Sequence, residues 1–299
     1  MVRSISEILL FKNSKDKEKY LEIIQKYKEI YLFDVYAYCL MSTHAHLVID
    51  CCEADISKIM KSINQSYSSY YNYTYNRHGH VFQDRFKSKI IDNDNYLLNL
   101  TAYIHNNPKD ITEYAEDVSK YPYSSLGIFL GKNNYMSSLV NYKHILGYFS
   151  QDIIRARKTY LELMNRMYNI DNSAVFENLR LESEFCLEKS EYRSERNIIF
   201  RNVSPDMIVK YISKESGIYF NPHLKHSRKN DEFKALFVII MRSLSNHSLK
   251  EICTYISNTT LSNIWRLSEK GFNLITGNIK YTNMFNELVG TYKNYIPTA

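Results

Sequence analysis

The sequence predicts an α+β fold built on an antiparallel sheet, followed by an all-α unit. Two observations carry this prediction. Up to Pro108 the residue patterns follow the order helix, hairpin, helix, strand, helix, which is typical of helices packed on an antiparallel sheet. From about residue 203 to residue 290 the apolar residues recur at helical spacing. With 299 residues, 44% of them hydrophobic, the chain is long enough for two buried cores.

The first helix is expected at residues 14–30, where apolar side chains fall at helical spacing and Ser14 is a candidate N-cap. Two strands follow this helix. Residues 33–41 (FDVYAYCLM) are rich in aromatic and β-branched side chains, and residues 44–51 (HAHLVIDC) continue this pattern. The connection between them is short, which predicts that the two strands pair in an antiparallel hairpin.

Two more helices flank a third expected strand. Residues 55–72 carry one apolar stripe at helical spacing, and residues 95–106 form a helical pattern that Pro108 ends. Between them, residues 81–91 alternate, which places three basic side chains on one strand face. Such a ladder suits contact with a nucleic-acid backbone, and it equally suits a solvated strand edge protected by charge. The ladder residues are Arg85, Lys87 and Lys89.

The chain divides into three segments by pattern. Residues 1–135 are expected to form the α+β domain, and residues 136–202 a helical linker rich in charge. Residues 203–290 are expected to form the all-α unit and to fold without the rest of the chain.

Charge and cysteine content narrow the function classes. Residues 1–135 hold equal numbers of basic and acidic side chains, so the net charge of +6 comes from residues 136–299. A basic excess there is compatible with a nucleic-acid partner. The five cysteines form no C-x-x-C pair, which argues against a zinc ribbon or a disulfide framework. The apolar runs are too short for a membrane span or a signal peptide, so we expect a cytoplasmic, nucleoid-associated protein without a membrane partner.

Two short motifs carry the candidate chemistry. In a strand, His44 and His46 project from the same face, while Ala45 points to the core. Their imidazoles can converge on one ion, although imidazole binds many metals. Tyr103 and Asn107 lie one helical turn apart and share a face. Taken alone, in a chain with 27 tyrosines, this second pair is better explained by a core tyrosine and an asparagine that ends a helix before a proline.

Together the two motifs supply matched roles for cutting a phosphodiester. Such a reaction needs a positioned nucleophile and a cation that absorbs the developing charge. A tyrosine phenol has an ordinary pKa of about 10, so it needs assistance to attack. Tyrosine also leaves again readily, which makes the covalent link reversible and allows strand joining.

Four ordered segments, AYCLMSTHAHLVI, GHVFQDRFKSKII, YLLNLTAYIHNNP and YPYSSLGIFLG, resemble the single-tyrosine HUH transposases, in particular the REP-associated tyrosine transposase branch. The resemblance implies a ferredoxin-like antiparallel sheet with helices on one face. It implies that His44 and His46 bind Mg²⁺ or Mn²⁺, with Asn107 as a third ligand, and that Tyr103 is the nucleophile. Members of this family cleave single-stranded DNA at or beside a hairpin, leaving a 5′-phosphotyrosine and a free 3′-OH.

The N-terminus departs from the family pattern. Family members begin with a strand followed by an Arg-Gly turn, whereas this chain offers MVRSISEILLF, so the first strand is expected to be missing or replaced. The alternative function is therefore a catalytically decayed, transposase-derived protein that binds DNA or regulates. Whether the chain forms a homodimer is left open.

The C-terminal unit has a resemblance of its own. Residues 243–267 (SLSNHSLKEICTYISNTTLSNIWRL) resemble the helix-turn-helix of DnaA-type DNA-binding domains, with a first helix at 249–255 and a recognition helix at 260–267. This resemblance implies duplex DNA as a second partner, and a helical bundle without DNA contact is the alternative. The residues expected at the duplex are Arg228 and Lys229, on phosphates, with Thr260, Ser262, Asn263 and Arg266.

Overall fold

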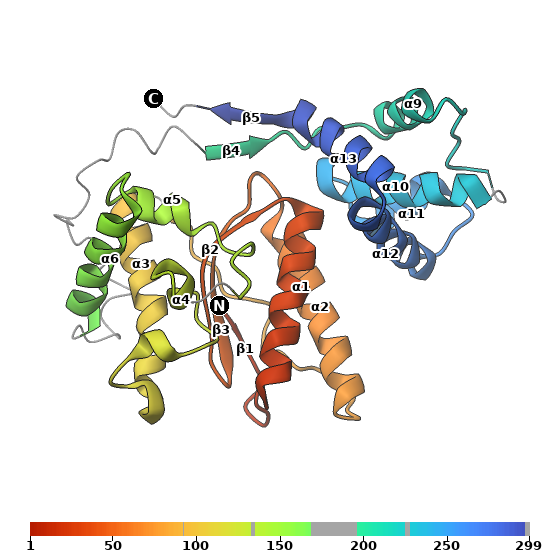
Figure 1. Ribbon diagram of the computed structural model, residues 1–299. Helices are drawn as coiled ribbons and strands as arrows, with labels where there is room; N and C mark the ends of the chain where they lie inside the picture. The colour runs from red at the N-terminus through yellow and green to blue at the C-terminus, as the bar shows by residue number, and fades with distance from the viewer. Residues whose placement is uncertain (92, 133–134, 169–195, 225–227, 297–299) are drawn as a thin grey trace.

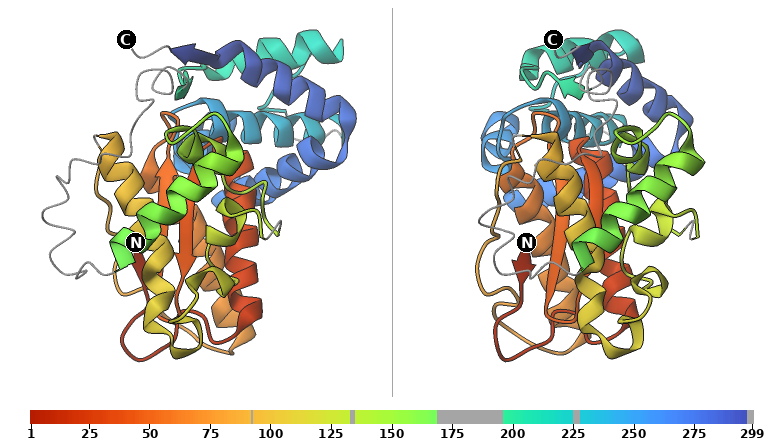
Figure 2. Two further views of the ribbon diagram at one scale, coloured as in Figure 1. Left: turned by 60° about the vertical axis from the view of Figure 1, so that its left-hand side comes forward. Right: turned by 90° about the vertical axis from the view of Figure 1, so that its left-hand side faces the viewer.

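A computed structural model describes residues 1–91, 93–132, 135–168, 196–224 and 228–296 (Figure 1). A small antiparallel sheet lies between two groups of helices, and a second, mainly helical unit packs against one of these groups (Figure 1, Figure 2). This arrangement confirms the α+β class for the N-terminal part of the chain.

The sheet contains β1 (Val2–Arg3), β2 (Asp34–Leu40) and β3 (His44–Asp50), in the order β1-β3-β2. β2 and β3 form the expected antiparallel hairpin, with Cys39 opposite His46. The first strand, which the sequence predicted to be missing or replaced, is present. It is two residues long and pairs with β3 through Val2 opposite Ala45 and Arg3 opposite His44.

The prediction of a regular strand at residues 81–91 is wrong. This segment runs beside β1, where Gln83 N donates to Arg3 O at 3.0 Å and Lys87 N donates to Met1 O at 3.0 Å. Only one isolated bridge, between Ser4 and Phe82, has strand geometry there. A ladder of hydrogen bonds needs a partner of matching length, and β1 offers two residues. Arg85, Lys87 and Lys89 therefore do not form a ladder on one strand face.

Helices cover both faces of the sheet, so the expectation of helices on one face is also wrong. α1 (Ser14–Tyr31) and α2 (Ile56–Thr74) lie on one side, and α3 (Asp94–Asn106) lies on the other (Figure 1). The reason lies in the sequence of β2 (DVYAYCL), which places apolar side chains on both faces of the sheet, and every residue after Asp34 is buried. A strand that is buried on both sides needs cover on both sides.

The helical segment expected to be a linker begins as part of the N-terminal unit. α4 (Leu126–Phe129), α5 (Tyr142–Gly147) and α6 (Ile153–Tyr168) lie on the α3 side of the sheet (Figure 1, Figure 2). Buried His105 of α3 is hydrogen-bonded to the Tyr160 hydroxyl of α6 at 2.7 Å. Residues 169–195, the middle of the expected linker, lie outside the described residues.

In the C-terminal unit, every described element between Val203 and Gly290 is a helix. A short antiparallel pair, β4 (Arg196–Ile199) with β5 (Lys293–Ile296), flanks these helices and was not expected. α10 (Arg228–Leu244) and α12 (Leu261–Gly277) cross closely at Gly271, where any side chain would clash with the Ala235 carbonyl. The helices are α9 (Pro205–Ser216), α10 (Arg228–Leu244), α11 (Leu249–Ile256), α12 (Leu261–Gly277) and α13 (Ile279–Tyr292).

Two buried arginines join the C-terminal part of the chain to α1 and to the loop before α2. Arg242 of α10 donates to the Tyr31 hydroxyl at 2.6 Å and to Ser268 Oγ of α12 at 2.6 Å. Arg201 donates to the carbonyls of Tyr31, at 2.7 Å, and Cys52, at 3.1 Å. Buried guanidinium groups need such partners to offset their loss of hydration. These bonds hold the two units in a fixed relation.

Candidate functional site

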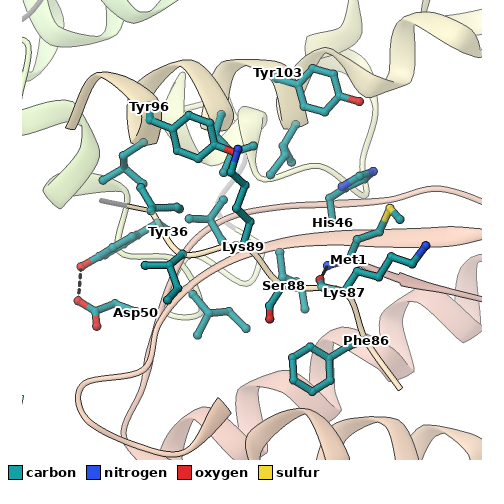
Figure 3. Close-up of a pocket in the computed structure, with 18 of the residues that line it drawn as sticks. Met1, Tyr36, His46, Asp50, Phe86, Lys87, Ser88, Lys89, Tyr96 and Tyr103 are labelled. Carbon is teal, nitrogen blue, oxygen red and sulfur yellow. Dashed lines mark hydrogen bonds between the residues drawn. The ribbon is translucent and has the colours of Figure 1, made fainter. Parts of the chain in front are cut away.

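The expected site residues of β3 and α3 face one another across a cavity (Figure 3). The His44 and His46 rings are perpendicular, with centroids 5.0 Å apart. The Tyr103 ring lies 6.3 Å from the His46 ring, also perpendicular to it. Ala45 is fully buried in the core, as the strand alternation predicts. The structure thus brings together three side chains that the sequence places on two separate elements.

Helical spacing explains how α3 presents Tyr103. Tyr96, Leu100, Tyr103 and Asn107 recur every three or four residues and line the cavity together. The opposite face of α3 is anchored by His105, which is hydrogen-bonded to Ser125 Oγ at 2.6 Å as well as to α6. This anchoring fixes the rotation of α3 and therefore the direction of the Tyr103 side chain.

The cavity is large, with a volume of about 1270 Å³. One end holds His44, His46, Tyr103, Asn107 and Asp110. The other end reaches β2 and α5, beyond the residues that the sequence motifs had singled out. Its size exceeds that of most small-molecule pockets, which suits a segment of a polymer.

Burial sets the protonation of both histidines. It lowers the pKa of His46 to about 3, and the neighbouring His44 adds to this effect. Burial also lowers the pKa of His44, with a further contribution from the Arg3 guanidinium. Both imidazoles are therefore neutral at pH 7, which is the form that binds metal ions.

Tyr103 stays a phenol in this environment. Partial burial raises its pKa, and the carboxylate of Asp110 raises it further. Asp110 lies three residues after Asn107, at the end of the short 3-10 helix η1 (Asn107–Asp110). Sequence reasoning missed Asp110, because a single exposed carboxylate after a helix carries no signal of its own.

The two imidazoles fit a shared metal ion. If each ring nitrogen binds one ion at ~2.1 Å, the ring centroids lie roughly 4.6–5.3 Å apart for bond angles of about 90–109°. The observed separation of 5.0 Å falls in this range. No cluster of three or more His, Cys, Asp or Glu ligands occurs among the described residues. Asn107 lines the same cavity, and its Nδ2 donates to the Tyr103 carbonyl at 3.0 Å.

The expected basic residues separate into two groups. Lys87 and Lys89 are exposed and line the cavity. Lys89 Nζ lies 4.8 Å from the centroid of the Tyr96 ring, which places it between the two ends of the cavity (Figure 3). Arg85 is exposed on the same segment but does not line this cavity.

The expected duplex-binding residues lie on α10 and α12. Thr260 is the N-cap of α12 and accepts from Asn263 N, while Ser262 and Arg266 are exposed on the same helix. Arg266 donates to Asn263 Oδ1 at 3.0 Å. α11 and α12 occur where the two helices of the motif were expected, and α12 ends ten residues later than expected, at Gly277. Arg228 and Lys229 begin α10, and their side chains lie outside the described part of the structure.

Comparison with known proteins adds one match. The family model described as "Transposase IS200 like" matches residues 5–107, about a third of the chain. The matched segment contains His44, His46, Tyr103 and Asn107. It is thus similar to IS200-like transposases, which supports a transposase role and DNA as a partner. Searches of curated proteins and of solved structures found no match. No described helix is long and apolar enough to cross a membrane.

Proposed function

We propose that this protein is a transposase that cuts and rejoins single-stranded DNA through a 5′-phosphotyrosine on Tyr103, with Mg²⁺ or Mn²⁺ as cofactor. One observation carries the proposal: the Tyr103 ring faces the His46 ring inside one cavity, and His44 lies beside His46. A nucleophile and a candidate metal pair thus share one open space, as the chemistry requires.

Strand cleavage by Tyr103 needs no reactant other than the DNA strand and the tyrosine hydroxyl. The Tyr103 hydroxyl oxygen bonds to the scissile phosphorus, and the bond from phosphorus to the 3′-oxygen breaks. The phenolic proton ends on the leaving 3′-oxygen, directly or through solvent, which gives a free 3′-OH. The reverse step rejoins a strand, because the phenolate is a good leaving group.

The residues around Tyr103 assist this step in distinct ways. His44 and His46 would hold the metal ion, with Asn107 as the third protein ligand, and the ion would stabilise charge that develops on the scissile phosphate. Lys87 and Lys89 line the same cavity, where they can attract a phosphate backbone. The raised pKa of Tyr103 means that the phenol attacks only as its proton departs.

The sheet order supports a ferredoxin-like ancestry for this domain. Residues 81–87 lie beside β1, so the backbone order across the sheet is this segment, β1, β3 and β2. A segment that follows α2 and returns to the side of β1 is the fourth strand of such a fold, here reduced to a loosely paired chain. The family match over residues 5–107 covers β2, β3 and residues 81–87 of this arrangement and begins just after β1.

The C-terminal unit is proposed to bind duplex DNA through a DnaA-type helix-turn-helix. α11 begins with a capping box between Ser248 and Glu251, and the turn before α12 has positive φ at Ser257 and Asn258. The exposed side chains of Ser262 and Arg266 lie on the first turns of α12, where a recognition helix contacts DNA. Thr260, Asn263, Arg228 and Lys229 complete the proposed contact set.

The proposal is tested with labelled, hairpin-flanked single strands and Mn²⁺, by looking for a protein–DNA adduct that survives denaturing electrophoresis. Tyr103→Phe should abolish the adduct and leave DNA binding intact. Tyr73→Phe is the matched control, because Tyr73 is fully exposed at the end of α2 and away from the cavity. Absence of any adduct with the unmodified chain would contradict the proposal and favour a transposase-derived DNA-binding protein that no longer cuts.

A further inference from the structure

The cavity extends well past the proposed catalytic residues. Its far end is lined by Tyr36 of β2, Tyr96 of α3, His144 of α5 and Tyr148 directly after α5, which we call the aromatic end. α5 lies after residue 107, so part of this end is outside the segment that matches the transposase family. The proposed cutting reaction gives no role to these four side chains.

The aromatic end is a preformed stack with one accessible ring. Tyr36 and His144 are parallel, with centroids 4.6 Å apart and planes 7° from each other. Tyr148 packs its edge against His144 at 5.5 Å. Tyr36 and Tyr148 are buried, whereas His144 is half-buried and lines the cavity, where a further planar group can stack on its ring.

Two carboxylates stand beside this stack. Asp50 accepts hydrogen bonds from the Tyr36 hydroxyl and from Cys52 N, both at 3.0 Å, and Asp94 accepts one from the Tyr148 hydroxyl at 3.3 Å. Both line the cavity. An ionised carboxylate has about four acceptor positions and no donor, so each can accept further N–H groups. The exocyclic amino groups of adenine, cytosine and guanine are such donors, and thymine has none.

Lys89 stands over the Tyr96 ring, on the side of the aromatic end that faces the nucleophile. Figure 3 shows Lys89 between Tyr36 and Asp50 on one side and Tyr103 and His46 on the other. Along the cavity, the stacked rings with their carboxylates therefore come first, Lys89 comes second and Tyr103 comes third. A nucleotide strand can match this order, because a base can lie on the aromatic rings while the neighbouring phosphates lie at Lys89 and Tyr103.

We propose that the aromatic end binds one unpaired, amino-bearing nucleobase of single-stranded DNA, next to the phosphate that Tyr103 attacks. This inference rests on the proposed function for the identity of its substrate. The base would stack on His144 and donate its amino group to Asp50 or Asp94, and Lys89 would contact the adjoining phosphate.

The test measures binding without metal, so that cutting does not enter. Fluorescent hexanucleotides of adenine, cytosine or thymine, and an abasic hexanucleotide of equal charge, are titrated with the full-length Tyr103→Phe chain. Loss of one stacked base should weaken binding roughly 5- to 150-fold, so the adenine and cytosine strands should bind that much more tightly than the abasic strand. The thymine strand should lie between them.

Variants assign the effect to the aromatic end. His144→Ala should bring the adenine and cytosine strands close to the abasic affinity, while Lys143→Ala, an exposed neighbour on α5, should change nothing. Replacing both carboxylates, by Asp50→Ala with Asp94→Ala, should remove the preference for cytosine over thymine. Lys89→Ala should weaken all four strands equally, because it acts on the backbone.

Equal binding of cytosine and abasic strands, or full retention of base dependence in His144→Ala, would overturn the inference. These outcomes are separate from failure of the proposed function. Base-dependent binding in a chain that forms no adduct with Mn²⁺ would support the aromatic end and contradict cutting. An adduct together with base-independent binding would support cutting and contradict the role of the aromatic end.

Discussion

Gly271→Ala should destabilise the C-terminal unit, although alanine favours helices. Gly271 lies inside α12 where this helix crosses α10. A methyl group there would lie 3.0 Å from Ile239 Cβ and closer still to the Ala235 carbonyl oxygen. Neither neighbour can move alone, because Ala235 and Ile239 are fully buried in α10.

The expected magnitude follows from two opposing effects. Alanine in place of glycine inside a helix contributes about 1 kcal/mol of stability. Forcing an extra methyl group into a packed crossing costs about 1–3 kcal/mol, and the backbone contact here favours the upper part of that range. The net expectation is a loss of roughly 1–2 kcal/mol in the free energy of unfolding, measured by urea titration with circular dichroism.

Gly290→Ala is the matched control. Gly290 also lies inside a helix, α13, but nothing lies within 4 Å of the position that its Cβ would take. This variant should therefore gain stability, by up to about 1 kcal/mol. If Gly271→Ala were as stable as Gly290→Ala, the close crossing of α10 and α12 would be refuted, and with it the placement of α12.

Further predictions concern pH, metal and charge. Burial lowers the pKa of His46 and of His105 to about 3, so both stay neutral in the folded chain while the unfolded chain takes up protons below about pH 6.5. The free energy of unfolding should thus fall with decreasing pH, by up to ~1.4 kcal/mol per pH unit for each histidine, and His105→Gln should shrink this slope in urea titrations. His44→Ala should raise the Mn²⁺ concentration needed for half-maximal adduct formation, whereas His80→Ala, exposed and outside the cavity, should not. Lys89→Ala should reduce the salt dependence of single-strand binding by about 0.7 in log–log slope, and an unchanged slope would remove this lysine from the DNA path.

The local part of the site could be predicted from the sequence. Strand alternation alone places His44 and His46 on one face and Ala45 in the core, and helical spacing alone places Tyr103 above Asn107. The hairpin of β2 and β3 is likewise a local feature, because its connection is only Met41-Ser42-Thr43.

The rest depends on contacts between distant segments. The alternation at residues 81–91 gave a strand, but strand formation also needs a partner, and the short β1 was not visible in the sequence. Cover on both faces of the sheet depends on α3, α5 and α6 packing together. His144 and Tyr148 reach the cavity only through that packing, so no motif near Tyr103 could have indicated them.

The central claim is that the Tyr103 oxygen becomes bonded to DNA phosphorus. The most direct measurement is mass spectrometry of the trapped adduct after nuclease and trypsin digestion. Cleavage after Lys89 and Lys109 releases one peptide that contains both Tyr96 and Tyr103. Fragmentation should place the nucleotide remnant on Tyr103 and leave Tyr96 unmodified. A remnant on Tyr96 or on any other residue, or an adduct that persists in Tyr103→Phe, would contradict the account.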